Sequence, residues 1–417
     1  MLAVPAVRIC LLSSILLLAS EPTFAQDFSE PRLALHRGEV ERLLEVSPAA
    51  QLLTAVANES AAARVGQDLF QQTNPDLQIF AGPRTGVGPK TQSDVGLIIG
   101  VPFDLSFSRN RRMALADARV RLADADALER FWRLRFDTLD LWVQVQAATS
   151  RIKLSQQRFD LDQKILQSVE TRLRAGVIGQ ADVSLARAVA SESLAKLRLT
   201  NAERDRLSYL LLGRLGIPER EVVYDGQLPQ HDAPPLSQLL AHLGERPDFF
   251  RMQQEEAALQ SDKGLQDKLR IPVARVQGEV TKEADERLAR FGVSIPMPLF
   301  QRNQTARSVA NARLKTWQAQ QRALQAQAQA EVRAAYARWQ GARDAFAQMN
   351  ASQSDIEQAI ALSARAYELG QTPLGQLLMA RREVSLVRES ALQAQIEEAR
   401  ARLALEQASY TEKKAIP

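Results

Sequence analysis

The side chains that usually carry chemistry are few in this sequence and lie far apart. Its three histidines are His36, His231 and His242, and no two of them have the i, i+4 spacing that places two metal ligands on one helical face. The single cysteine is Cys10. No phosphate-binding loop, nucleophile elbow or converging pair of carboxylates stands in the sequence. We therefore expect no catalytic, cofactor-binding or metal site, and we predict that the chain is not an enzyme.

The composition indicates long, thinly packed helices. Aromatic residues make up only 6% of the chain and charged residues 24%, and Ala, Leu, Gln and Arg dominate long tracts. The formal net charge of +4 is small for 417 residues and is dispersed, so it gives no support for a nucleic-acid partner. Carboxylates spread along helix faces are typical of solvated surfaces.

The first residues read as an export signal. Arg8 precedes an apolar run over 9–19, and Thr23-Phe24-Ala25 is a small-x-small cleavage site before Gln26. We predict a signal peptide at 1–25, with an uncleaved anchor as the alternative. Cleavage would remove Cys10 and leave an unlipidated mature chain without a thiol. No later window holds 18 consecutive apolar residues, so any membrane crossing would have to use strands.

An internal repeat organises the rest of the chain. Pro102 recurs as Pro296 and Gly176 recurs as Gly370, in both cases 194 residues later. The dipeptides Ser47-Pro48 and Arg246-Pro247 mark matching starts of the two repeats. They lie 199 residues apart, five more than the other landmarks. The expected units are a first repeat at 26–234, a second repeat at 235–410 and a C-terminal tail at 411–417.

Each repeat has the same order of expected elements. A helix (about 37–73, then about 235–270) precedes a β-hairpin (about 76–103, then about 272–297). We expect Pro102 and Pro296 to end the hairpins, because proline cannot donate to a strand ladder. The run 273–280 alternates apolar and polar residues, whereas the first pair of strands shows no strong amphipathic pattern.

A long helical hairpin closes each repeat. The tract from Ser106 to Arg172 covers 67 residues, or roughly 100 Å of helix. Gly176 and Gly370 stand where the chain must reverse. The return helix that begins near Leu377 has apolar residues at alternating three- and four-residue steps, interrupted only at Glu398. Those positions are Ala380, Val384, Val387, Ala391, Ala394 and Ala401. We expect the four tryptophans, Trp132, Trp142, Trp317 and Trp339, to be packing residues of the long helices.

Such helices need neighbours that one chain does not supply. Four strands cannot close a membrane barrel, which needs about eight or more to leave no open edge. Three identical chains would provide about 12 strands, enough for a closed barrel around a lumen. The fold class expected is therefore mainly α with a small β part, in a symmetric oligomer.

The sequence resembles the TolC-like outer-membrane efflux proteins over nearly all of its mature length. The stretch 291–304, Phe-Gly-Val-Ser-Ile-Pro-Met-Pro-Leu-Phe-Gln-Arg-Asn-Gln, is similar to the CzcC-like heavy-metal branch, as are 367–370 and 377–380. The resemblance implies a homotrimer in outer-membrane lipid, with a 12-stranded β-barrel above a periplasmic α-barrel. It also implies docking to a periplasmic adaptor (membrane fusion protein) and an inner-membrane RND-type pump. The implied role is passive conduction to the outside, with heavy-metal cations among the candidate substrates.

The resemblance also assigns roles to individual positions. The adaptor-contacting tips would be formed by Arg172, Leu173, Gly176, Tyr367 and Gly370. A pore constriction would involve Asp182 and its counterpart Gln376, and the amide at 376 argues against a strong acidic ring at the second tip. Each position also has a plainer interpretation. Gly176 and Gly370 would be ordinary turn glycines, Arg172 a solvated arginine, and Asp182 a carboxylate that favours a helix start.

Two other functions remain open from the sequence. A soluble periplasmic adaptor or coiled-coil scaffold would also contain a long helical hairpin, although usually one hairpin rather than two equivalent ones that follow strand pairs. An enzyme would need a convergent polar pocket, and the residues that could build one are absent from the sequence.

Overall fold

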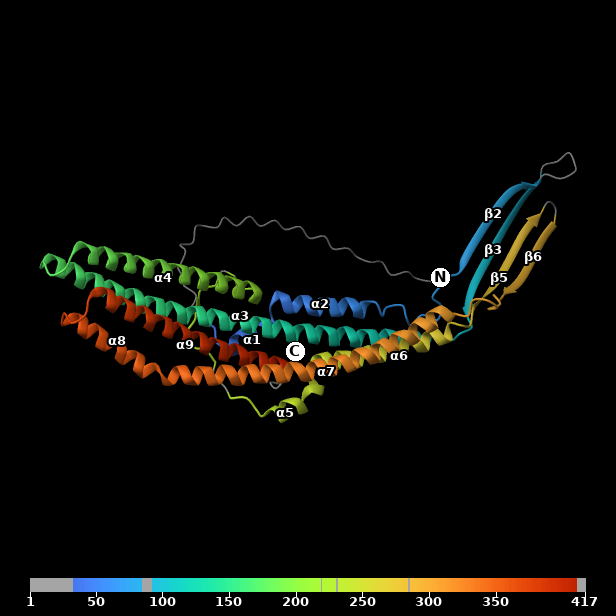
Figure 1. Cartoon of the computed structure of the whole chain (residues 1–417). Coiled ribbons are helices and arrows are strands. Elements are labelled where there is room, and N and C mark those ends of the chain that lie inside the picture. The colour runs from blue at the N-terminus through green and yellow to red at the C-terminus, as the bar shows by residue number, and fades with distance from the viewer. Residues whose placement is uncertain (1–32, 85–91, 219, 230–231, 284–285, 411–417) are drawn as a thin grey trace, which may run out of the picture.

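The computed structural model describes residues 33–84, 92–218, 220–229, 232–283 and 286–410. The predicted signal peptide at 1–25, His231 and the tail at 411–417 lie outside these ranges. The described chain is elongated, with helices running along one axis, a four-stranded sheet at one end and two helical reversals at the other (Figure 1). None of the helices within these ranges has the length and hydropathy needed to cross a bilayer.

The same order of elements occurs twice. The first set is β1 (Leu33–Ala34), α1 (Arg37–Glu45), α2 (Pro48–Ala62), β2 (Asp76–Arg84), β3 (Gln92–Asp104), α3 (Arg109–Arg174) and α4 (Gln180–Leu215). The second set is β4 (Val222–Val223), α5 (Leu236–Ala241), η1 (Leu243–Glu245), α6 (Pro247–Lys268), β5 (Val273–Glu283), β6 (Glu286–Ser294), α7 (Gln304–Ala351), α8 (Gln353–Glu368) and α9 (Leu374–Ser409).

The single helices expected at about 37–73 and about 235–270 are wrong. Each is divided where a proline begins a new helix, at Pro48 of α2 and Pro247 of α6. Proline disfavours helical geometry in the residue before it and suits the first helical position. Ser47 adds a cap, since its hydroxyl accepts a hydrogen bond from the N–H of Ala50 at 3.2 Å. The first of these helices also ends earlier, at Ala62.

The long helices differ between the repeats. Helix α3 is continuous over 66 residues, or roughly 100 Å. Its counterpart is divided into α7 and α8 at Ser352, which corrects the expectation of one tract. The Ser352 hydroxyl donates to the carbonyl of Gln348 at 3.2 Å. Thr138 and Thr149 make the same bond to the preceding turn within the unbroken α3, so this bond by itself does not divide a helix.

The sheet has the order β2-β3-β5-β6, and all three of its ladders are antiparallel. Strand β3 continues through Pro102 to Asp104, so the expectation that Pro102 ends the strand is wrong. Pairing with β2 stops at Gly100, so one side of β3 is open at Pro102 and a missing donor is tolerated there. Strand β6 ends at Ser294, before Pro296.

The register divides the sheet into an apolar face and a polar face, including the first pair of strands. The apolar face carries Leu77, Ile79, Ala81, Val95, Leu97, Ile99, Val101, Phe103, Ala274, Val276, Val280, Ala289, Phe291 and Val293. The opposite face carries mainly polar and charged side chains together with Phe80, Ile98, Val273 and Leu288, and the apolar face ends in the charged pair Lys282 and Arg287 near the hairpin loop. In the first pair, glycines and Phe80 on the polar face hide the alternation from a reading of the sequence.

The main core lies midway along the molecule, where the short helices pack on the long ones. All four tryptophans are buried, which confirms that they are packing residues. The indole N–H of Trp142 donates to the carbonyl of Leu35 at 3.0 Å, and that of Trp317 donates to Met252 at 3.0 Å. The first bond joins the segment before α1 to α3, and the second joins α6 to α7.

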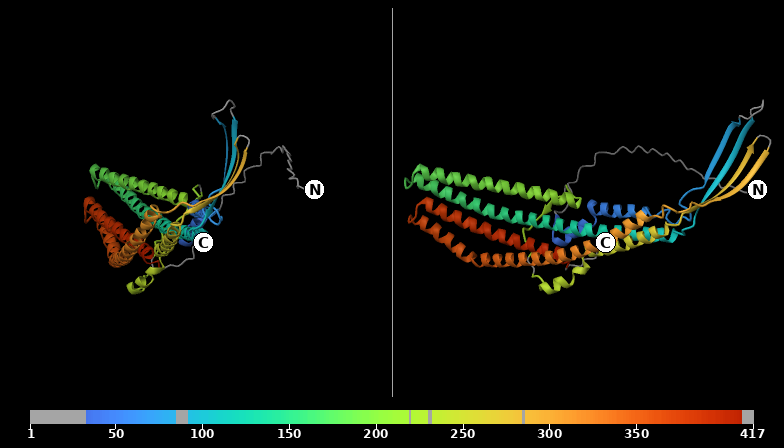
Figure 2. Two further views of the ribbon diagram at one scale, coloured as in Figure 1. Left: turned by 90° about the vertical axis from the view of Figure 1, so that its right-hand side faces the viewer. Right: turned by 45° about the vertical axis from the view of Figure 1, so that its right-hand side comes forward.

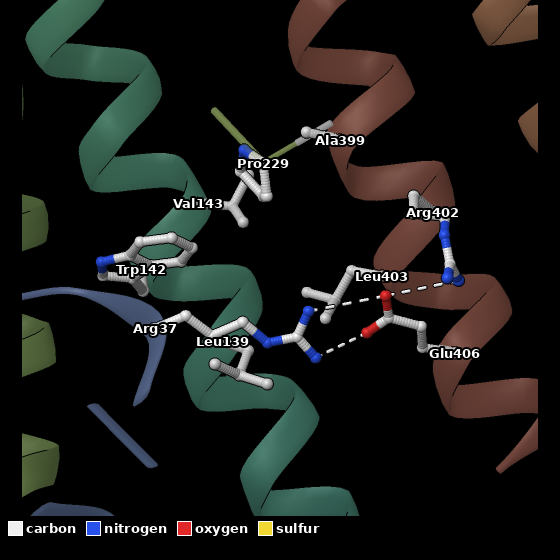
Figure 3. A pocket seen from close by; sticks show the side chains of 9 residues that line it. All are labelled: Arg37, Leu139, Trp142, Val143, Pro229, Ala399, Arg402, Leu403 and Glu406. Carbon is white, nitrogen blue, oxygen red and sulfur yellow. Dashed lines mark hydrogen bonds and ion pairs between the residues drawn. The ribbon is translucent and has the colours of Figure 1, made fainter. Parts of the chain in front are cut away.

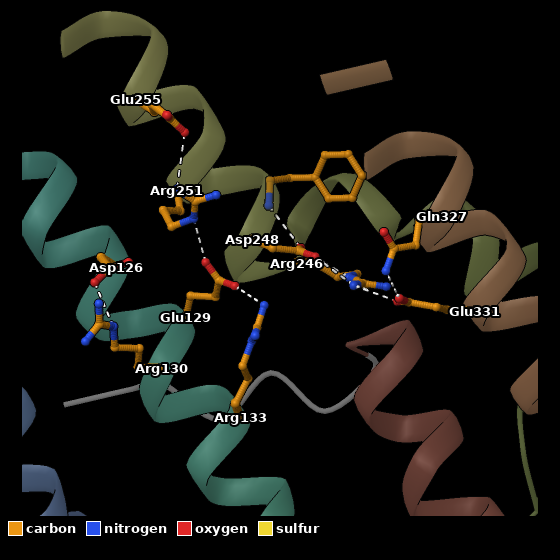
Figure 4. A network of polar contacts seen from close by, with 11 residues as sticks. Asp126, Glu129, Arg130, Arg133, Arg246, Asp248, Arg251, Glu255, Gln327 and Glu331 are labelled. Carbon is orange, nitrogen blue, oxygen red and sulfur yellow. Dashed lines mark hydrogen bonds and ion pairs between the residues drawn. The ribbon is translucent and has the colours of Figure 1, made fainter. Parts of the chain in front are cut away.

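Buried ion pairs complete this middle layer. Arg37 reaches across to α9 and pairs with Glu406, with Nη2 and Oε2 2.6 Å apart (Figure 3). In a second network, Glu129 of α3 pairs with Arg251 of α6 at 2.6 Å, and Arg246 joins Asp248 at 2.7 Å (Figure 4). Because each charge has a partner, these groups link helices of both repeats without an uncompensated buried ion.

Candidate functional site

The two helical reversals have the same backbone geometry. Gly176 has φ +73° and Gly370 has φ +72°, conformations that a side chain disfavours. At the first reversal, the N–H of Gly176 bonds to the carbonyl of Leu173 and that of Val177 to Arg172. At the second reversal, Gly370 and Gln371 make the equivalent bonds to Tyr367 and Ala366. Both ends are therefore Schellman caps, and the 194-residue repeat preserves them.

Arg172 ties the two reversals together. Its guanidinium carbon lies 4.4 Å from the centroid of the Tyr367 ring. The same group donates to the carbonyls of Tyr367 at 3.1 Å and Glu368 at 2.9 Å. A cation at the C-terminal end of α8 is favoured by the helix dipole as well as by these bonds. The two reversals lie beside each other at one end of the molecule in both views (Figure 2).

The predicted tip positions differ in exposure. Gly176 and Gly370 are exposed, Arg172 and Leu173 are half-buried, and Tyr367 is only 5% exposed. Tyr367 packs in a small core with residues of α3, α4 and α9. Its position therefore holds the second reversal against the first rather than presenting a surface.

Two exposed apolar residues at the reversals were not singled out from the sequence. Val177 is 69% exposed and Leu369 is 64% exposed, each beside the turn glycine. An apolar residue adjoining a helix-stop glycine is the signal that could have found them. Each tip therefore presents one exposed apolar side chain, beside exposed polar neighbours such as Arg174 and Glu368.

Asp182 and Gln376 occupy equivalent places, each at the third residue of the helix that leaves its reversal. The N–H of Asp182 donates to the carbonyl of Gly179 at 3.2 Å, and that of Gln376 donates to Pro373 at 3.1 Å. Asp182 is half-buried and Gln376 is exposed. A carboxylate at this position stabilises a helix start, so Asp182 has a local structural role whatever else it does.

A groove of about 1010 Å³ separates the two helical hairpins just behind the tips. On its floor, Arg381 of α9 donates to Asp162 of α3 at 3.1 Å, and Arg158 lies 3.8 Å from the same carboxylate. Burial raises the pKa of Asp162 and lowers the pKa of Arg381. For each group, burial therefore affects the pKa more than the opposite charge does.

The polar face of the sheet has two side-chain contacts that depend on glycine. Asp76 and Arg275 pair across the intervening strand, with Oδ1 and Nη1 2.5 Å apart, and Gly100 lies beneath them. Phe80 lies over Gly96, where a Cβ would stand 2.1 Å from the ring. These contacts cover the bare glycine backbone on a face that otherwise contacts water.

The structure thus combines paired helical hairpins with a separate sheet that is apolar on one face and polar on the other. That architecture defines the class of outer-membrane channel proteins. The model of the family "Outer membrane efflux protein" matches residues 51–210 and 241–409, one segment in each repeat. The chain belongs to this family, which confirms the resemblance found in the sequence.

Known relatives are distant. The chain is 25% identical over 213 residues to the cobalt-zinc-cadmium resistance protein CzcC of Cupriavidus metallidurans, a region that is 49% of this chain and 50% of the relative. The matched region thus spans about half the length of that curated relative.

Solved structures show the same fold at low identity. CusC has a TM-score of 0.71 at 17% identity, covering 89% of this chain and 92% of that one. VceC from Vibrio cholerae has a TM-score of 0.70 at 16% identity, covering 89% and 96%. The CmeC outer membrane channel of Campylobacter jejuni has a TM-score of 0.70 at 12% identity, covering 96% of each chain.

Proposed function

We propose that this protein is the outer-membrane duct of a tripartite efflux system and works as a homotrimer. The observation that carries the proposal is the sheet, which is apolar on one face and polar on the other, and whose edges, β2 and β6, have no strand partner among the described residues. Its strands of 9 to 13 residues suit a tilted membrane crossing. Three copies would close about 12 strands into a barrel with a polar lumen.

Conduction through this duct is passive. The chain supplies a wet passage, and the energy comes from an inner-membrane pump of the RND type that is reached through a periplasmic adaptor. Heavy-metal cations are the substrate class suggested by the name of the Cupriavidus relative. No catalytic role is proposed for any residue.

The tips are the proposed docking surface for the adaptor. Gly176 and Gly370 turn the chain at the exposed end, with Val177 and Leu369 as the apolar surface. Arg172, Leu173 and Tyr367 support that surface from behind through the contact between the two reversals.

The pore constriction is proposed to lie one turn further along each return helix. Asp182 places a carboxylate there in the first repeat, and Gln376 places an amide in the second. Three copies would thus put three carboxylates, rather than six, around the axis.

A soluble adaptor or scaffold is the second candidate. A long helical hairpin favours it, but two equivalent hairpins and an exposed apolar sheet face disfavour it. That face would contact water in a soluble protein, and patches of this kind normally mark an interaction site.

The experiment is the purification of the chain from its host's outer-membrane fraction in detergent, followed by sizing with light scattering before and after heating. We expect a trimer that dissociates on heating and conducts ions in a planar bilayer. A monomer or dimer recovered from the soluble periplasmic fraction would overturn the duct and favour the adaptor.

A further inference from the structure

Both edges of the sheet lead directly into apolar segments. Strand β2 leaves the helical body at Asp76, and β6 returns to it at Ser294. The two edge strands run in opposite directions, so β6 of one chain can pair with β2 of another as the inner strands already pair. Such pairing would bring the residues before β2 of one chain next to the residues after β6 of the other.

The residues at these two places are large, apolar and exposed. Before β2, Leu69 is 56% exposed and Phe70 is 57% exposed. After β6, Met297 is 78%, Leu299 is 61% and Phe300 is 88% exposed. An exposed cluster of this size beside an open strand edge indicates an interaction surface.

Both segments are held in place before any partner arrives. Phe70 packs edge-to-face on Phe103, with ring centroids 5.8 Å apart. In the connector after β6, Arg302 Nε donates to the carbonyl of Pro298 at 2.9 Å, and Gln304 Nε2 donates to that of Phe300 at 2.9 Å. Two prolines, at 296 and 298, restrict the connector further. Little conformational entropy would be lost on docking.

We propose that the connector Met297–Phe300 of one copy packs on Leu69 and Phe70 of a second copy, as an apolar clamp beside the β6–β2 seam. The proposal rests on the trimer proposed above and adds the residues that hold its seam. Within one chain the two segments stand at opposite edges of the sheet, three strand spacings or roughly 14 Å apart. A second copy is favoured over a lipid surface because the two clusters lie at complementary ends of one ladder, whereas a lipid site would need only one of them.

Disulfide cross-linking between differently tagged chains tests the clamp. In a Cys10→Ser background the chain has no other thiol. A chain carrying Phe70→Cys is co-expressed with a chain carrying Phe300→Cys, and membranes are oxidised with copper phenanthroline. We expect a disulfide that joins the two tags, since bridged Cα atoms lie within about 7 Å. The control pairs Phe300→Cys with Leu362→Cys, which is 69% exposed on α8, and should give at least tenfold less product.

The outcomes separate this inference from the proposed function. A wild-type trimer, together with no disulfide between the Phe70→Cys and Phe300→Cys chains, would overturn the clamp and leave the duct standing. Absence of a wild-type trimer would overturn both. A spin label attached to the Phe300→Cys variant reports on the lipid alternative in phosphatidylethanolamine–phosphatidylglycerol vesicles. If oxygen reaches that label but a water-soluble nickel chelate does not, the connector lies in lipid and the clamp is overturned.

Discussion

The Arg172 guanidinium, at the end of the first long helix, stacks on the ring of Tyr367, at the end of the second, 4.4 Å from its centroid. It also donates to two of the last carbonyls of α8, those of Tyr367 and Glu368. One side chain of the first repeat therefore caps a helix of the second. This contact makes the two hairpins a single tip.

Replacing Arg172 by Ala should loosen the second reversal. Loss of the stacking and of two charge-assisted hydrogen bonds at a half-buried site should cost about 1–2 kcal/mol. Hydrogen exchange in a peptide covering 366–372 should then become roughly 5–30 times faster. Arg174→Ala is the matched control, because Arg174 is exposed and donates to Thr171 within its own helix. Equal exchange in the two variants would mean that the contact does not hold the tip.

The turn glycines should resist substitution for a backbone reason alone. At Gly176 and Gly370 no atom lies within 4 Å of the place that a Cβ would take, so Ala at either site meets only the cost of positive φ. That cost is about 1–2 kcal/mol. Limited proteolysis at the affected tip should become roughly 5–30 times faster. Gly375→Ala, with equal space and ordinary φ, should leave the rate unchanged. A similar increase in that control would refute the backbone explanation.

The pair Asp162–Arg381 should show the behaviour of buried ions. Arg381→Met alone leaves Asp162 buried beside one remaining arginine, and should cost roughly 3 kcal/mol. The double variant Asp162→Leu with Arg381→Met should be within about 1 kcal/mol of wild type, or more stable. Thermal unfolding followed by circular dichroism in detergent distinguishes these results. The single variant Asp162→Leu is measured as well. If the losses of stability in the two single variants simply add in the double variant, this prediction is contradicted.

The same pair should respond to pH. Burial raises the pKa of Asp162 above its usual 3.8. Between 3.8 and that raised pKa, the folded chain keeps a proton that the unfolded chain has released. This carboxyl therefore favours the folded state more as the pH falls through its raised pKa, and less as the pH rises. As the pH falls, the melting temperature of wild type should rise relative to that of Asp162→Asn. A constant difference would show that Asp162 does not titrate as inferred.

The Phe80 ring and Gly96 should behave as one unit in the sheet. Gly96→Ala forces the ring aside and should lower stability by about 1 kcal/mol, the scale of a cross-strand pair. In a Phe80→Ala background the same change should be neutral or favourable. The measurement is the temperature at which the folded band disappears on a semi-native gel. Gly278→Ala is the control, since no atom lies within 4 Å of its Cβ position. An equal loss in both backgrounds would show that the ring and the glycine are independent.

The repeat was readable from the sequence because its landmarks depend on local backbone chemistry. Gly176 and Gly370 end helices since glycine tolerates positive φ, and Pro48 and Pro247 begin helices since proline suits the first turn. These preferences act within a few residues, so spacing alone exposed the two hairpins, whereas the family resemblance rested on the motifs at 291–304, 367–370 and 377–380.

Other features depended on contacts between distant segments. Pro102 lies inside β3 because the pairing of β3 with β2 stops at Gly100. Glu398, which interrupts the apolar pattern of α9, is buried. The amphipathic character of the first hairpin emerged only when the register set Phe80 over Gly96.

The sequence by itself determined the two-repeat architecture, the buried tryptophans and the family. The tertiary structure decided that Tyr367 is buried while Val177 and Leu369 are exposed, and that Arg172 joins the two tips. Burial at a tip depends on which helices lie beside it. That arrangement arises from packing between segments about 195 residues apart, which local sequence patterns do not encode.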